Sequence, residues 1–188
     1  VVSGRQMSEL LLRKGKSKAK IAIIDANFNM HALDLRVAAF KFMTADQYPG
    51  FEIVANEKAG SIEDALKVTE NLFTAHPDLD AIFATYSSAL IGAARAKQSR
   101  KKADLVLTGI DADREVCKLI KLGVVDGSGV NNSYPFGVKC VEVAHEYMTQ
   151  KKVFLTPFYV PAPLLDINTV DAIYQQLYGE PLSKYRSK

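Results

Sequence analysis

Lys20-Ile-Ala-Ile-Ile24 is the first of four short apolar runs that decide the fold. The other three are Phe51-Glu-Ile-Val54, Ala81-Ile-Phe-Ala84 and Leu105-Val-Leu-Thr-Gly109, and each run is followed by an amphipathic stretch. Short apolar runs that alternate with helical periodicity are typical of buried parallel strands joined by helices. The sequence therefore predicts a three-layer α/β/α sandwich with a mainly parallel, Rossmann-like sheet and right-handed crossovers.

The segments between and after these runs carry helix signals. Apolar spacing, caps and stop residues predict helices over residues 3–14, 31–43, 61–76, 89–97, 111–122, 136–150 and 168–177. Ser61 is the expected cap of the third helix, Ser87 or Ser88 of the fourth, and Asn168 of the last. Residues 154–165 read as extended, with prolines that exclude a central strand, and the basic tail from Pro181 reads as loose.

Composition excludes several classes of protein. A chain of 188 residues with 48% hydrophobic residues can bury one good core, and its net charge of +3 is spread along the sequence, which argues against a nucleic-acid surface. No apolar run approaches the roughly 20 residues that span a bilayer, and no leader peptide is visible. Cys117 and Cys140 lack the spacing of a metal or redox motif, so two buried free thiols are expected.

Catalytic signatures are weak. His31, His76 and His145 fall on three separate predicted helices, which gives a catalytic triad or a metal cluster no local support. Neither Gly127-Ser-Gly129 nor Lys14-Gly-Lys-Ser17 has the spacing of a nucleotide-binding glycine loop. We therefore expect no enzyme activity, no cofactor and no metal.

Binding residues are expected where the parallel strands end, because loops and helix N-termini converge in the crevice beyond the carboxyl ends. A hydroxyl-rich ligand selects Asp, Asn and Arg side chains together with an aromatic face. The predicted ligand-binding residues are Asn27, Asn29, Arg36, Gly60, Tyr86, Asp111 and Asn131, with Asn132 as an alternative to Asn131.

Each of these residues also has a structural alternative. Asp111 could accept ligand hydroxyls or cap the helix that follows it, and both roles can coexist. Arg36 could reach back over the crevice or pair with Asp34, and Tyr86 could stack on a ring or lean on the sheet edge. Asn131 could serve turn chemistry instead.

Several motifs also match one known family in order and spacing. They are Asp25-Ala-Asn-Phe-Asn29, Arg36 four residues before Phe40, His76-Pro-Asp-Leu-Asp-Ala-Ile-Phe-Ala84, Ala89-Leu-Ile-Gly-Ala93, Thr108-Gly-Ile-Asp111 followed by Ile120-Lys-Leu-Gly123, Asn131 with Gly137 six residues on, and Val160-Pro-Ala-Pro-Leu-Leu-Asp-Ile-Asn-Thr-Val-Asp171. Together they resemble the periplasmic-binding-protein type 1 family, which contains sugar-binding proteins of ABC transporters and the effector domains of LacI-type repressors. The resemblance covers nearly the whole chain.

This resemblance implies a carboxyl-terminal fragment of a two-lobe protein that closes on its ligand like a hinge. Residues 1–165 would form the second lobe, with a segment of the first lobe returning at about 132–156, and residues 166–188 would form a hinge-following helix and a basic tail. By position, Arg36, Asp111 and Asn131 match ligand-binding places of the family, whereas Tyr86 replaces a usual Asn and Ala39 a usual Gly.

The function implied is the binding of a sugar or polyol for an ABC importer, with a transporter permease or membrane sensor as partner. The alternative is a LacI-type effector domain, and neither role needs nucleic acid to touch this segment. The expected location is that of a periplasmic protein or an extracellular lipoprotein. The helix over 136–150 belongs to the first lobe in relatives, so its apolar face is expected to drive a homodimer of the fragment.

Overall fold

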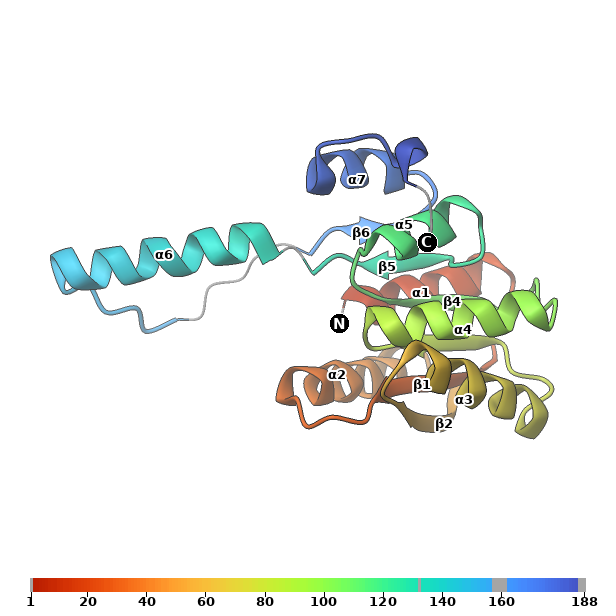
Figure 1. The fold of residues 1–188 in the computed structure, drawn as a ribbon. Coiled ribbons are helices and arrows are strands. Elements are labelled where there is room, and N and C mark those ends of the chain that lie inside the picture. Colours follow the sequence, from red (N-terminus) through yellow and green to blue (C-terminus); the bar gives the residue numbers. More distant parts are fainter. Residues whose placement is uncertain (1, 132, 157–161, 186–188) are drawn as a thin grey trace.

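The computed structural model describes residues 2–131, 133–156 and 162–185 (Figure 1). Its sheet has the strand order β2-β1-β3-β4-β5-β6. The strands are β1 (Ala19–Ala26), β2 (Phe51–Ala59), β3 (Ala81–Ala84), β4 (Val106–Ile110), β5 (Gly127–Gly129) and β6 (Leu164–Leu165). The first five pair in parallel, and β6 joins the sheet edge antiparallel to β5. The predicted fold class is confirmed, and the proline-rich segment is kept to the edge, although its residues 157–161 lie outside the described part.

Helices cover both faces of the sheet. On one face lie α1 (Val2–Arg13) and α2 (His31–Gln47), and on the other α3 (Ile62–Ala75), α4 (Ser87–Ser99) and α5 (Arg114–Lys121). The carboxyl-terminal α7 (Val170–Tyr178) and the short 3₁₀ helix η1 (Leu182–Lys184) pack against α5. No helix in the described residues is long and apolar enough to cross a membrane.

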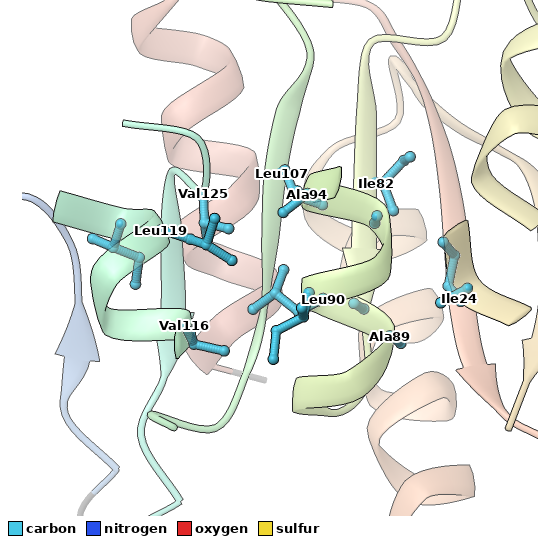
Figure 2. Packing of buried hydrophobic residues seen from close by; sticks show 14 of the residues in the cluster. Ile24, Ile82, Ala89, Leu90, Ala94, Leu107, Val116, Leu119 and Val125 are labelled. Atoms are coloured by element: carbon cyan, nitrogen blue, oxygen red, sulfur yellow. The ribbon is translucent and has the colours of Figure 1, made fainter. Parts of the chain in front are cut away.

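The core splits into two layers because side chains alternate along each strand. Ile21 and Ile23 of β1 pack with α1 and α2, whereas Ile24 packs with α3 and α4 on the other face. Figure 2 shows side chains of α4 and α5, among them Leu90 and Val116, gathered over the strands in this second layer. The alternating apolar runs of the sequence therefore become the buried centre of a three-layer protein.

The helix α6 (Ser133–Gln150) stands away from this body (Figure 1). None of its described residues is buried, although much of its surface is apolar. Its large exposed apolar side chains are Tyr134, Phe136, Val138, Val141, Tyr147 and Met148. Apolar patches of this kind mark contact surfaces in soluble proteins.

The carboxyl-terminal segment is packed rather than loose, so the prediction of a loose tail is wrong as far as Tyr185. Tyr174 is fully buried, and its hydroxyl accepts a hydrogen bond from Arg114 at 2.6 Å. Arg114 also pairs with Glu180, and the Tyr185 hydroxyl donates to Glu115 at 3.1 Å. Residues 186–188 lie outside the described part of the chain.

Local caps agree with the sequence in one helix and differ in others. The Ser61 hydroxyl accepts from the Asp64 amide at 3.0 Å, as predicted for α3. Neither Ser87 nor Ser88 caps α4, whose N-cap is Tyr86 without a side-chain bond. The N-cap of α7 is Thr169 rather than Asn168.

Both cysteines are free, but only one matches the expectation of a buried thiol. Cys117 is buried on the inner face of α5, whereas Cys140 is exposed on the projecting α6. Helical apolar spacing around Cys140 predicted burial because it presupposes a neighbour for that face, and the described residues supply none.

Candidate ligand-binding site

The carboxyl ends of the central strands meet at one edge of the sheet. Parallel pairing aligns Ile24 with Ala84 and Ala84 with Gly109, so the residues that follow these strands lie side by side. Asp25, Thr85 and Asp111 are thereby delivered to the same region. The turn between α4 and β4, residues 100–105, enters the sheet at the opposite edge.

Arg36 reaches this edge from α2. Its Nη1 donates a hydrogen bond to the Thr85 carbonyl oxygen at 2.7 Å, and its side chain is partly buried. The guanidinium therefore lies over the end of β3, a position that the sequence allowed for its long side chain, and its ligand-binding role stays a prediction. A planar guanidinium has further N–H donors beyond the one used here.

Asp111 follows β4 and caps a helix, but not the helix that was predicted. Its φ of 87° turns the chain so that α5 begins only at Arg114, with Asp113 as an N-cap that makes no side-chain bond. The Asp111 Oδ2 instead accepts a hydrogen bond from the Ser87 amide, at 3.2 Å, in the first turn of α4. It thus satisfies one of the amides that every helix N-terminus leaves unpaired.

The electrostatics of Asp111 bring three predicted residues together. Burial raises the pKa of Asp111, while the charge of Arg36, the Ser87 amide and a hydrogen bond from the Asn131 side chain act in the opposite direction. Asp113 adds a smaller upward influence on the same pKa. Arg36 and Asn131 therefore both lie near enough to Asp111 to influence its carboxylate, and residue 132 lies outside the described part.

A pocket of about 330 Å³ adjoins this group. Asp111 and Asn131 line it together with Ala112, Asp113, Ser133, Tyr134, Leu177 and Tyr178. Tyr178 is held in place because its hydroxyl donates to the Ala112 carbonyl oxygen at 2.9 Å. The pocket has the size of a small-molecule site, and its wall includes carboxylate, amide and hydroxyl groups.

The remaining predicted residues lie toward β1 and β2. The Tyr86 hydroxyl donates to the Ala59 carbonyl oxygen at 2.7 Å, so this ring bridges the ends of β3 and β2. Asn27 packs on Gly60 so closely that a Cβ there would lie 2.5 Å from its Nδ2. Asn29 is exposed before α2. These residues lie at the same carboxyl-end edge of the sheet, but outside the group of Arg36, Asp111 and Asn131.

Phe28 was not among the predicted ligand-binding residues, and it packs edge-on against Tyr86. The two ring centroids are 5.7 Å apart at an interplanar angle of 75°, and Phe28 remains 44% exposed. An aromatic residue between two polar turn residues, Asn27 and Asn29, was the available signal. The pair forms an aromatic wall beside the polar groups, and burial raises the pKa of Tyr86.

Asp25 is also delivered to this edge but is sealed inside it. It is only 2% exposed, and its carboxylate accepts from Thr85 Oγ1 at 2.7 Å and pairs with Lys58 at 2.5 Å. Burial works to raise the pKa of Asp25, but the hydrogen bonds from Lys58 and Thr85 outweigh it and hold that pKa below its usual value. In the described residues, no group of three or more His, Cys, Asp or Glu side chains could hold a metal ion.

Known proteins are similar to this chain in both sequence and fold. Residues 1–152 match the family model described as periplasmic binding protein domain. The ribose import binding protein RbsB of Salmonella typhimurium is 29% identical over 154 residues, which make up 81% of this chain and 51% of that protein. The D-apiose import binding protein of Paraburkholderia graminis is 26% identical over 104 residues, 55% of this chain and 33% of that protein.

Solved structures extend the likeness in fold. A periplasmic solute binding protein of an ABC transporter from Actinobacillus succinogenes, with bound D-allose, superposes with a TM-score of 0.79 at 23% identity over 90% of this chain and 60% of its own. A periplasmic ribose ABC transporter protein from Conexibacter woesei gives 0.81 at 20% identity, over 93% and 59%. The chain thus spans 51% of the length of the ribose-binding relative. With a family model that matches most of its length, this chain belongs to the periplasmic binding protein domain family.

Proposed function

We propose that this chain binds a small polyhydroxylated solute, a monosaccharide or related polyol, as part of the substrate-binding component of an ABC importer. The observation that carries the proposal is the convergence of Arg36, Asp111 and Asn131 at one edge of the sheet. A guanidinium donates, a carboxylate accepts and an amide does both, which suits hydroxyl groups that can donate and accept. Relatives named for ribose and D-apiose import support the same ligand class.

The proposed ligand site is one half of a two-lobe cleft. Residues 1–165 form the second lobe in this proposal, and the segment of about 132–156 packs on a complementary lobe that closes over the ligand. The exposed apolar surface of α6 supports this arrangement, because that surface needs a cover. In the absence of a complementary lobe, α6 would pair with a second copy of the chain.

The relatives reported above are import or transport binding proteins, which favours the importer over a repressor effector domain. The partners we propose are therefore a sugar and a transporter permease or membrane sensor, without nucleic acid. The compartment that goes with this role is the periplasm or, for a lipoprotein, the outer face of the cell. The role we propose is binding without catalysis.

Nuclear magnetic resonance titration tests the ligand class. Millimolar D-ribose, D-allose, D-arabinose and myo-inositol are added separately to the ¹⁵N-labelled chain, because half a site binds weakly. We expect at least one of them to shift the amide signals around Arg36, Asp111 and Asn131. Arg36→Gln should abolish these shifts, whereas Arg100→Gln should not, because Arg100 pairs with Glu70 at the opposite edge.

Two results would count against the proposal. Either none of the four probes shifts the signals at this edge, or the shifts survive Arg36→Gln unchanged. Binding as tight as that of a complete transport protein would instead contradict the half-site arrangement.

A further inference from the structure

Asp25 is a charged group at the carboxyl-end edge of the sheet, but its burial keeps it from contacting a ligand bound there. Its side chain is 3% exposed, and Thr85 and Lys58 occupy its oxygens. A buried carboxylate destabilises a fold unless hydrogen bonds compensate for its lost hydration, so its partners must keep a defined geometry. This geometry is set at Thr85.

Thr85 is fully buried and joins three elements. Its amide donates to the Ile24 carbonyl oxygen at 3.0 Å, and its hydroxyl donates to Asp25 at 2.7 Å. Its carbonyl oxygen accepts the hydrogen bond from Arg36 at 2.7 Å. The same short segment continues to Ser87, whose amide holds Asp111.

We propose that Asp25 and Thr85 are positioning residues: Asp25 fixes the Thr85 side chain, and thereby the carbonyl group that holds the Arg36 guanidinium beside Asp111. This inference rests on the proposed function, because it assigns Arg36 and Asp111 to the ligand. The Thr85 hydroxyl limits rotation of the residue, so the peptide plane that points at Arg36 is fixed from both sides. Lys58 holds the second Asp25 oxygen and keeps the carboxylate charged.

The decisive variant is Thr85→Val, which keeps the branched shape and replaces only the hydroxyl by a methyl group. Thr85→Ser is the matched control, because it keeps the hydroxyl. The readout is the pKa of Asp111, which is measured from the ¹³C chemical shift of its carboxyl group as the pH of the full 188-residue chain is varied. Arg36 draws this pKa downward, so a displaced guanidinium raises it further.

We expect Thr85→Val to raise the Asp111 pKa and Thr85→Ser to leave it unchanged. Arg36→Gln should raise it as well, and Thr85→Val should add nothing in the Arg36→Gln background. A purely structural role would lower the unfolding temperature in both backgrounds and leave the Asp111 pKa unchanged. An unchanged pKa in Thr85→Val, or an equal rise with and without Arg36, overturns the inference. If the valine variant does not fold, Thr85→Cys, a weaker donor, is judged by the same criteria.

Sugar binding provides a second, separable readout. With whichever of the four sugars shifts the wild-type signals, Thr85→Val should weaken affinity about tenfold, while Thr85→Ser should stay within about twofold of wild type. If no sugar binds the wild type, the proposed function fails, and the Asp111 titration still decides the positioning role. If a sugar binds and Thr85→Val binds it equally well, the positioning role fails alone.

Discussion

Asp111 caps α4, and we propose that it also binds the ligand; substitutions can separate these two roles. Asp111→Ala removes the oxygen that accepts from the Ser87 amide. The amide is partly buried, and loss of a helix N-terminal cap destabilises a protein by about 0.5–2 kcal/mol. In a chain of this length 1 kcal/mol corresponds to a shift of about 2–4 °C, so a loss of about 2 kcal/mol lowers the unfolding temperature by about 4–8 °C. Alanine also tolerates the positive φ of this position less well than aspartate does.

Asp111→Asn should behave differently, because it keeps an acceptor oxygen and removes the charge. Burial raises the pKa of Asp111, so the folded protein binds the proton more tightly than the unfolded chain. The free energy of unfolding therefore falls as the pH rises from the ordinary aspartate pKa of 3.8 through the folded pKa, and this deficit persists at neutral pH. We expect Asp111→Asn to be at least as stable as wild type at pH 7, although both variants should bind sugar less tightly.

Urea denaturation at pH 7 measures these differences as changes in the free energy of unfolding. Asp113→Asn is the matched control, since that exposed neighbour makes no side-chain cap bond and should change stability by less than about 0.5 kcal/mol. If Asp111→Asn loses as much stability as Asp111→Ala, the attraction of the Asp111 carboxylate to the charge of Arg36 outweighs its burial, and the electrostatic reasoning is wrong. If Asp111→Ala is as stable as wild type, the capping role is wrong.

Three further predictions concern the rest of the fold. Tyr174→Ala should lower the free energy of unfolding by about 3–5 kcal/mol in urea, because this side chain is fully buried; a loss below about 1 kcal/mol would mean that α7 is not part of the cooperative core. At neutral pH a thiol reagent should modify Cys140 rapidly and Cys117 only after unfolding, because burial raises the pKa of Cys117 to about 12; equal rates would contradict this. Because the pKa of Asp25 is lowered, its carboxylate stabilises the fold above the ordinary aspartate pKa of 3.8, and this stabilisation is lost on acidification through the folded pKa. Lys58→Met should therefore move the midpoint of acid unfolding, followed by circular dichroism, to higher pH; identical midpoints would refute this.

Hydrophobic patterning located the sheet because parallel strands covered on both faces need continuous apolar runs. It placed the core of β1, β3 and β4 within one or two residues. It ended β2 at Val54, whereas the strand continues to Ala59. Three of the five extra residues, Asn56, Glu57 and Lys58, are polar because β2 is an edge strand with an exposed side, and polar strand residues give no apolar signal.

The candidate site was predictable where it depends on strand ends and on the helix next to them, and not where it depends on distant partners. Asp111 and Asn131 follow from the rule that parallel strands end together, and Arg36 follows from its place in the helix after β1. The cap of α4 by Asp111 depends on a residue 24 positions away, and the bond between Asp25 and Thr85 joins residues 60 positions apart. Neither partner is marked by local spacing. The hydrogen bond that Arg114 of α5 donates to Tyr174 of α7 was not predicted for the same reason, because its partners lie far apart in the sequence.

The carboxyl and amino ends of the strands lie on opposite sides of the sheet, and this separation makes the chain suitable as a scaffold for a fluorescent reporter. The turn over residues 100–105 lies at the opposite ends of the strands from the groups proposed to meet a ligand, and its first residue, Arg100, makes an exposed pair with Glu70. Exposed turns of this kind accept inserted domains and new chain ends. A fluorescent module spliced in after Lys101, or a circular permutation opened there, would interrupt the β3–α4–β4 connection at its far end and leave the loops at the carboxyl ends of the strands uncut.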